Sequence, residues 1–176
     1  MEHSKSKITR LRRKWRLGRN RQAMGYTLFA ILAQPQALAF DPPWISDSRV
    51  IALEQGIRTI PVTKALYDGL AKQYAEDGTE DWAGFVLSPA SLATALSRLS
   101  ERGTVAYVEA DFFGGRGDQR CVVWRGGDIK LGPLDIESAI NKALSRLGVK
   151  RQLFRDEFET IGLNRHRSNE EWLAEA

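Results

Sequence analysis

Two acidic residues are the first candidates for chemistry in this chain. Glu109 and Asp111 lie two positions apart on the strand predicted over residues 104–112. Alternate residues of a strand face the same side, which places the two carboxylates about 7 Å apart. Carboxylates at that separation can act as general acid and base or bind a divalent cation. This pair is the basis of one hypothesis, a small hydrolase or a metal-binding enzyme.

A structural role is the favoured interpretation of the same two acids. Three arginines follow them in the neighbouring part of the chain, Arg116, Arg120 and Arg125. As cross-strand partners, these arginines can neutralise the carboxylates by ion pairing. We therefore predict ion pairs for Glu109 and Asp111, and we assign no catalytic residue.

Cysteine and histidine are too scarce for most metal or nucleophilic chemistry. Cys121 is the single cysteine, which excludes an intramolecular disulfide and a multi-cysteine zinc site. The two histidines are His3 and His166, so a transition-metal site is disfavoured. Cys121 is expected to fill the core and not to act as a nucleophile with His166 as its base. We expect no metal and no cofactor.

The densest glycine cluster lies in residues 113–119, which read Phe-Gly-Gly-Arg-Gly-Asp-Gln. Glycine permits positive φ and the close approach of a ligand or another backbone. The segment lacks the Gly-Lys-Ser/Thr of a phosphate-binding loop and leads into a strand, which excludes the dinucleotide-binding motif as well. We expect this segment to form a loop longer than a two-residue hairpin turn. We also expect it to be a contact surface for a partner. The predicted binding residues are Glu109, Asp111, Phe113, Gly114, Gly115, Arg116, Gly117 and Gln119.

The elements that position these residues form a predicted α+β domain with a mostly antiparallel sheet of five or six strands. Residues 104–131 predict a three-stranded meander, with a Gly-Gly turn before its last strand. Helices are expected to pack on one face of the sheet, and a short final helix closes an edge. The other predicted strands cover residues 26–33, 49–53 and 57–62, and the predicted helices cover 63–74, 88–102, 135–147 and 156–161.

Positive charge is concentrated at the start of the chain. Residues 1–23 contain nine Lys or Arg and one acid, whereas the other residues carry 17 basic and 21 acidic side chains. A basic groove for nucleic acid is therefore disfavoured on the domain predicted over residues 24–176. No run approaches the roughly 20 apolar residues of a membrane-spanning helix.

Three interpretations of residues 1–23 remain open. They can be a disordered extension, which we favour, with the domain beginning at Met24. They can be a basic arm that associates with nucleic acid, which is the single route to nucleic acid that we expect. They can also begin a signal peptide over residues 1–39, with Ala37-Leu38-Ala39 as its cleavage site. The first two interpretations predict a cytoplasmic protein, and the third predicts an exported one.

A short motif provides a resemblance to known proteins. The pattern FGGxGxQ is followed by a strand that ends in tryptophan and by a turn that contains glycine. In this respect residues 24–172 resemble small uncharacterised bacterial α+β proteins, some of which are similar to immunity proteins of toxin systems. The resemblance implies a non-enzymatic module with a protein partner, and we adopt this as the leading expectation. The residues that carry it are Phe113, Gly114, Gly115, Gly117, Gln119, Trp124 and Gly126.

Overall fold

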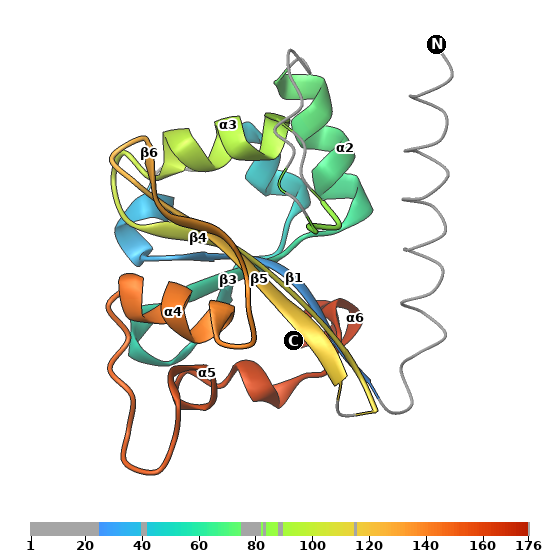
Figure 1. Cartoon of the computed structure of the whole chain (residues 1–176). Coiled ribbons are helices and arrows are strands. Elements are labelled where there is room, and N and C mark those ends of the chain that lie inside the picture. Colours follow the sequence, from blue (N-terminus) through green and yellow to red (C-terminus); the bar gives the residue numbers. More distant parts are fainter. Residues whose placement is uncertain are drawn as a thin grey trace.

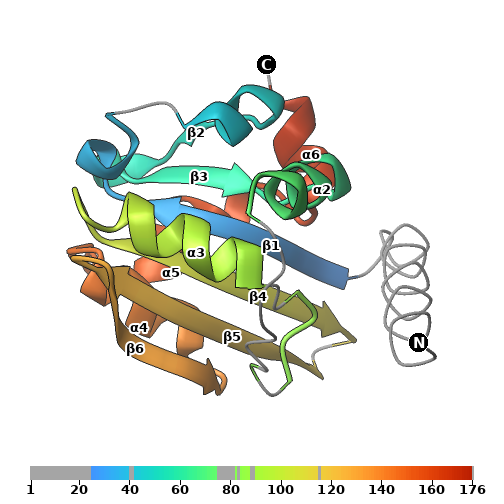
Figure 2. The ribbon, with the colours of Figure 1, turned by 90° about the horizontal axis from the view of Figure 1, so that it is seen from above.

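The computed structural model consists of a central β-sheet with helices on both sides (Figures 1 and 2). It describes residues 25–39, 42–74, 82, 84–87, 90–114 and 116–175. The basic segment 1–23, Gly115 and the predicted Ser88-Pro89 helix start lie outside these residues. Within them, no helix is both long enough and apolar enough to span a membrane.

Six strands of the described chain form one antiparallel sheet in the order β2-β3-β1-β4-β5-β6. The predicted α+β class and antiparallel sheet are confirmed, as is the predicted three-stranded meander β4-β5-β6. The long strands β1 and β4 pair over nine residues at the centre of the sheet. The strands are β1 (Gly25–Ala33), β2 (Ile51–Ala52), β3 (Arg58–Pro61), β4 (Val105–Phe113), β5 (Arg116–Arg125) and β6 (Asp128–Asp135).

The prediction that helices cover one face of the sheet is wrong in this detail, because helices cover both faces (Figure 1). One face packs against α2 and α3, and the other packs against α4 and the C-terminal elements. The helices in the described chain are α2 (Lys64–Gln73), α3 (Ala90–Leu99), α4 (Ala139–Arg146), α5 (Glu157–Thr160) and α6 (Asn169–Ala174). Short 3-10 turns are η1 (Pro35–Leu38), η2 (Pro43–Asp47), η3 (Glu54–Gly56) and η4 (Leu163–Arg165).

The residue pattern of β4 explains the two layers. Val105 and Tyr107 face the layer that contains α2 and α3, whereas Ala106 and Val108 face the layer that contains α4. All four side chains are fully buried. A central strand that is apolar on both faces needs cover on both sides. Cys121 of β5 is also buried, as predicted, and burial raises the pKa of its thiol to about 12.

The helix boundaries follow their caps. Thr63 caps α2 as predicted, since its hydroxyl accepts a hydrogen bond from the amide of Leu66. The predicted helix start at Asp135 is wrong, because β6 continues through Asp135 and α4 begins four residues later. The strand is longer because Asp135 pairs with Arg120 of β5, both in register and by a 3.0 Å ion pair.

One amide side chain connects the C-terminal helix α6 to the centre of the sheet. The Asn169 amide nitrogen donates to the carbonyls of Phe29 (2.8 Å) and Val62 (3.1 Å). Its oxygen accepts from the backbone amide of Phe29 (2.9 Å). Trp172, three residues further on, is fully buried. The side chain of Asn169 thus supplies hydrogen bonds to backbone groups where β1 and the end of β3 separate.

Candidate functional site

The carboxylate of Glu109 is buried, and the fold already supplies its hydrogen bonds. Glu109 is 1% exposed. Its oxygens accept hydrogen bonds from the backbone amides of Val86 (2.7 Å) and Leu87 (2.8 Å) and from the Tyr107 hydroxyl (2.9 Å). The guanidinium of Arg120 lies 3.9 Å away. These contacts tie the segment 84–87 to β4, and an acid–base role would require a substrate to reach this enclosed carboxylate.

Opposing effects act on the protonation of Glu109. Burial raises its pKa above the ordinary value of 4.5. The amides of Val86 and Leu87, the Tyr107 hydroxyl and Arg120 favour the charged form and oppose that increase. The net direction is upward, because removal of the carboxylate from water has the largest effect.

Arg120 connects acids of three strands, β4, β5 and β6. Its side chain forms ion pairs with Asp118 and Asp135, each at 3.0 Å, besides its longer approach to Glu109. The predicted ion pairing of Glu109 with an arginine of the meander is therefore confirmed for Arg120. A Cβ atom at Gly84 would lie 2.7 Å from the Asp135 carboxylate, so glycine lets the segment 84–87 pack against this cluster.

Aromatic packing holds the segment 84–87 from the other side. The Phe85 ring lies 6.1 Å from the Tyr107 ring and 5.4 Å from the Trp82 ring. Trp82 also packs against Trp124, with ring centroids 5.5 Å apart. The residues around Glu109 therefore form a part of the core that hydrogen bonds and ring packing hold together. Aromatic rings lie beside its polar groups.

The hairpin between β4 and β5 is tighter than the sequence prediction. Phe113 pairs with Arg116, so the connection is a two-residue turn, and the expected longer loop is wrong. Gly117 belongs to β5, where a Cβ atom would lie 2.2 Å from the carbonyl oxygen of Asp111. The glycine cluster thus serves the close approach of two strands as well as the turn.

The predicted binding residues are divided between the tip of this hairpin and its base. Phe113, Gly114 and Arg116 are exposed at the tip, where Phe113 is 49% exposed. At the base, the side-chain oxygen of Gln119 accepts a hydrogen bond from the Ile140 amide (3.2 Å), which fixes the start of α4. Asp111 is partly buried and lies opposite Asp118 in the register. The structure therefore brings only the tip residues together as an accessible surface.

A second surface was missed by the sequence interpretation. It is the basic-apolar loop, which we define as residues 150–156, between α4 and α5. Leu153 is 82% exposed and Phe154 is 95% exposed. Phe154 also has a φ of +64°, in the left-handed region that favours glycine or asparagine. These are the most exposed large apolar side chains in the described part of the protein.

Hydrogen bonds fix both ends of the basic-apolar loop. The Gln55 side chain accepts from the Lys150 amide (2.9 Å) and donates to the Lys150 carbonyl (2.7 Å). The Gln152 amide donates to the Thr160 hydroxyl (3.0 Å), and the Arg155 amide closes a turn on the Gln152 carbonyl (3.2 Å). The loop is thus held in a defined conformation that directs two apolar side chains into solvent.

The available sequence signal for this loop was the string Lys-Arg-Gln-Leu-Phe-Arg at 150–155. Two large apolar residues stand between basic ones, outside any periodic element. Periodicity identifies the buried face of a helix or strand, but it gives no information on the direction of a loop side chain.

Comparisons with known proteins add no functional assignment. No family model, curated protein or solved structure matches this chain. Among the residues that the structure describes, no group of three or more His, Cys, Asp and Glu side chains could hold a metal ion.

Proposed function

We propose that this protein is a binding module that presents the basic-apolar loop, residues 150–156, to a protein partner. The observation that carries the proposal is Phe154, a large apolar side chain that is 95% exposed on a backbone with positive φ. Exposure gives up the free energy that burial of the ring would supply, about 2 kcal/mol. A partner that buries Phe154 and Leu153 would recover that free energy.

The backbone of Phe154 supports this interpretation. A non-glycine residue with φ near +60° is strained by about 1–2 kcal/mol, and such residues persist where the surroundings fix them. Here the hydrogen bonds of Lys150, Gln152 and Arg155 supply that constraint. A preordered loop loses little conformational entropy on association, which favours binding.

The charges beside the loop indicate the chemistry of the partner. Lys150, Arg151 and Arg155 are all exposed. The loop contains one acid, Asp156, whose carboxylate caps α5 and accepts a hydrogen bond from Asn141, so the three basic side chains leave the loop with a net positive charge. The loop therefore presents an apolar centre with a positive border. Its complement is an apolar cleft on a protein, bordered by Asp and Glu.

The resemblance to immunity-like proteins supports a narrower version of the proposal, in which the partner is a toxin. In that version the basic-apolar loop contacts the toxin, and the tip of the β4–β5 hairpin is a second candidate contact. The two surfaces can be separated by mutation, because each contains one exposed phenylalanine, Phe154 and Phe113.

The test compares tagged wild-type protein with Phe154→Asn and Phe113→Asn. Asparagine tolerates the left-handed backbone at position 154 but removes the ring. We expect that a host protein captured by the wild type, and then purified, binds Phe154→Asn at least about 30-fold more weakly, as for an interface hot spot. Phe113→Asn should bind it with little change.

Three results would contradict the proposal. The purified partner could bind Phe154→Asn as tightly as the wild type, which would exclude this loop. It could lose affinity only with Phe113→Asn, which would place the contact at the hairpin. Alternatively, the wild type could bind vesicles of anionic lipid in a manner that depends on Phe154, with no protein partner, which would make the loop a membrane contact.

A further inference from the structure

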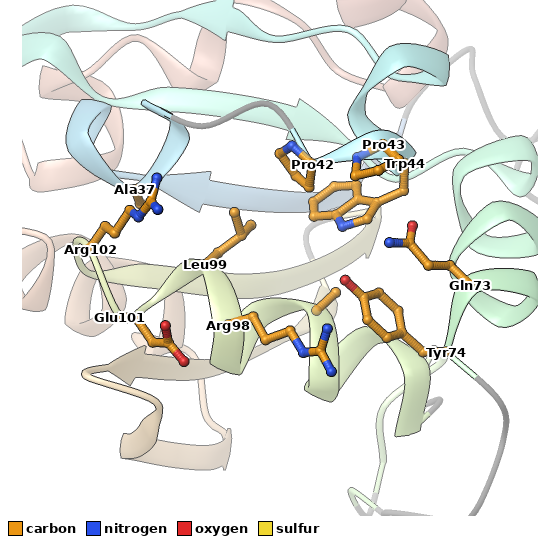
Figure 3. A pocket seen from close by; sticks show the side chains of 11 residues that line it. Ala37, Pro42, Pro43, Trp44, Gln73, Tyr74, Arg98, Leu99, Glu101 and Arg102 are labelled. Atoms are coloured by element: carbon orange, nitrogen blue, oxygen red, sulfur yellow. The ribbon is translucent and has the colours of Figure 1, made fainter.

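A pocket of about 330 Å³ lies between η2, the end of α2 and α3 (Figure 3). None of the residues that line it belongs to the basic-apolar loop. Its apolar wall includes Pro42, Trp44 and Leu99, and its polar groups include Gln73, Tyr74 and Arg98. This volume is at the small end of the range for ligand pockets in proteins. It can accommodate a molecule with one or two fused rings.

The indole of Trp44 supplies an unused hydrogen-bond donor to this pocket. Trp44 is 4% exposed, so almost all of its ring is buried. Figure 3 shows its nitrogen edge directed toward the Tyr74 hydroxyl across the pocket. Within the described chain, the indole N–H makes no hydrogen bond, and neither does the Tyr74 hydroxyl. An indole N–H that opens onto a pocket and has no protein partner can donate a hydrogen bond to a ligand or a water molecule there.

Arg98 adds a positive charge beside the same groups. Its guanidinium lies over the Tyr74 ring, 5.1 Å from the centroid. In the part of the chain that the structure describes, Arg98 forms no ion pair. This cation–π contact places the guanidinium beside the pocket, and its N–H groups remain available as donors. A carboxylate is one of the small anions whose geometry matches two parallel N–H donors.

The other two charged residues of the pocket lie away from these donors. Arg102 and Glu101 are at one end of the pocket, whereas Gln73 and Tyr74 are at the other (Figure 3). The Gln73 end therefore gathers the donors of Trp44, Tyr74 and Arg98 without a nearby acid among the lining residues. An anion is favoured at this end, and a flat apolar group is favoured on Trp44 and Leu99.

We propose that this pocket binds a small aromatic carboxylate. The carboxylate accepts hydrogen bonds from Arg98 and from the indole N–H of Trp44. The aromatic body of the ligand packs on Leu99 and Pro42. This site is separate from the protein-binding surface proposed above, and neither proposal depends on the other.

The test is calorimetric titration of the full chain with 2-naphthoate and with its neutral amide, 2-naphthamide. The two probes have nearly the same shape and differ in charge. We expect naphthoate to bind at least about tenfold more tightly than naphthamide to the wild type, since hydrogen bonds between charged groups are the stronger ones.

Three variants locate the binding site. Arg98→Met should weaken naphthoate binding by about tenfold or more and leave naphthamide binding unchanged. Trp44→Phe retains an aromatic wall without the donor and should weaken naphthoate binding by several-fold, on the order of the loss of one hydrogen bond. Arg125→Met, an exposed arginine on β5 outside the pocket, is the matched control and should bind both probes as the wild type does.

Thermal unfolding of each variant establishes that it is folded before titration. Arg98 is exposed, so its replacement is expected to leave the fold intact even where the Trp44 variant is destabilised. Equal affinity of the wild type for the two probes would overturn the proposal. Unchanged naphthoate affinity in Arg98→Met, or no saturable binding at millimolar concentration, would do the same.

Discussion

Glu109 and Phe154 reverse the usual distribution of charged and apolar side chains, and they do so for different reasons. Glu109 is a carboxylate at 1% exposure, whereas Phe154 is an aromatic ring at 95% exposure. Burial of a carboxylate is costly unless it is hydrogen-bonded and paired, and around Glu109 every such contact is made within the fold. For Phe154 the fold offers no compensating contact, although it holds the loop backbone in place.

This difference separates a structural site from a candidate functional one. An unusual residue whose neighbours complete its interactions is explained by the fold. An unusual residue whose interactions are left incomplete is a candidate for contact with a partner. By this criterion the β4–β5 meander is mainly structural at its base, and the basic-apolar loop and the Trp44 pocket are the places where a partner or ligand would bind.

The largest expected effect tests the structural role of the meander. Gly117→Ala should lower the free energy of unfolding by about 3 kcal/mol, because its Cβ atom would lie 2.2 Å from the Asp111 carbonyl oxygen. Gly114→Ala at the turn is the control. It has open space around the added atom but a φ of +61°, so about 1 kcal/mol is expected. Urea denaturation measures both values, and equal effects would show that Gly117 is not required for strand approach.

A smaller loss is expected for Glu109→Gln, about 2 kcal/mol in mildly acidic buffer. The amide nitrogen of glutamine cannot accept the hydrogen bond that the Val86 amide now donates to the carboxylate. Glu137→Gln, at an exposed position, should change stability by less than about 0.5 kcal/mol. Indistinguishable unfolding curves for the two variants would contradict the structural role of Glu109.

Comparison of the wild type with Glu109→Gln at several pH values gives a second test of Glu109. The folded-state pKa of Glu109 is raised above the ordinary value of 4.5, so the folded protein holds a proton that the unfolded chain releases. The contribution of Glu109 is therefore complete below about pH 4.5 and decreases as the pH rises through the folded pKa. The stability difference between wild type and Glu109→Gln should fall in that direction. A difference that increases with pH would mean that the Val86 and Leu87 amides outweigh burial.

The smallest effect is expected at the basic-apolar loop, and its sign is opposite. Phe154→Asn should leave stability unchanged or raise it by about 0.5–1 kcal/mol, because asparagine tolerates the left-handed backbone and no buried contact is lost. Differential scanning calorimetry checks this. A destabilisation of more than about 1 kcal/mol would show that the Phe154 ring contributes to the fold. Phe154 would then be a structural residue, as Glu109 is.

Much of the framework could be predicted from local sequence patterns. The Thr63 cap and the strands of the meander depend on neighbouring residues, which the sequence displays directly. The cover of both sheet faces was also accessible, because residues 28–33 are apolar without interruption and such a strand is buried on both sides. The end of β6 could not be predicted from local sequence, because Asp135 stays in the strand through its cross-strand pairing with Arg120.

The functional surfaces could be predicted less well because they depend on contacts between distant segments. Trp44, Tyr74 and Arg98 come from three separate elements that meet only in the folded protein. The conformation of Phe154 depends on Gln55 and Thr160, and Gln55 lies 95 residues from its partner Lys150. The glycine and acidic residues of the meander were predicted to bind a partner because of their residue types. In the structure they serve mainly the close approach of the strands and ion pairing.

The amide of Asn169 has a consequence for how the chain is made. Its partner Phe29 precedes it by 140 residues, an interval that takes a ribosome roughly 7–28 seconds to translate. During that time β1 can pair with β3 and β4, and the Phe29 carbonyl can accept from the Val62 amide, but the Phe29 amide and the Val62 carbonyl lack their Asn169 partner. The sheet therefore acquires its last internal hydrogen bonds only when synthesis has nearly finished. A translating ribosome that stalls before α6 would hold a nascent domain in which β1 is still open to water near Phe29, where β3 no longer pairs with it.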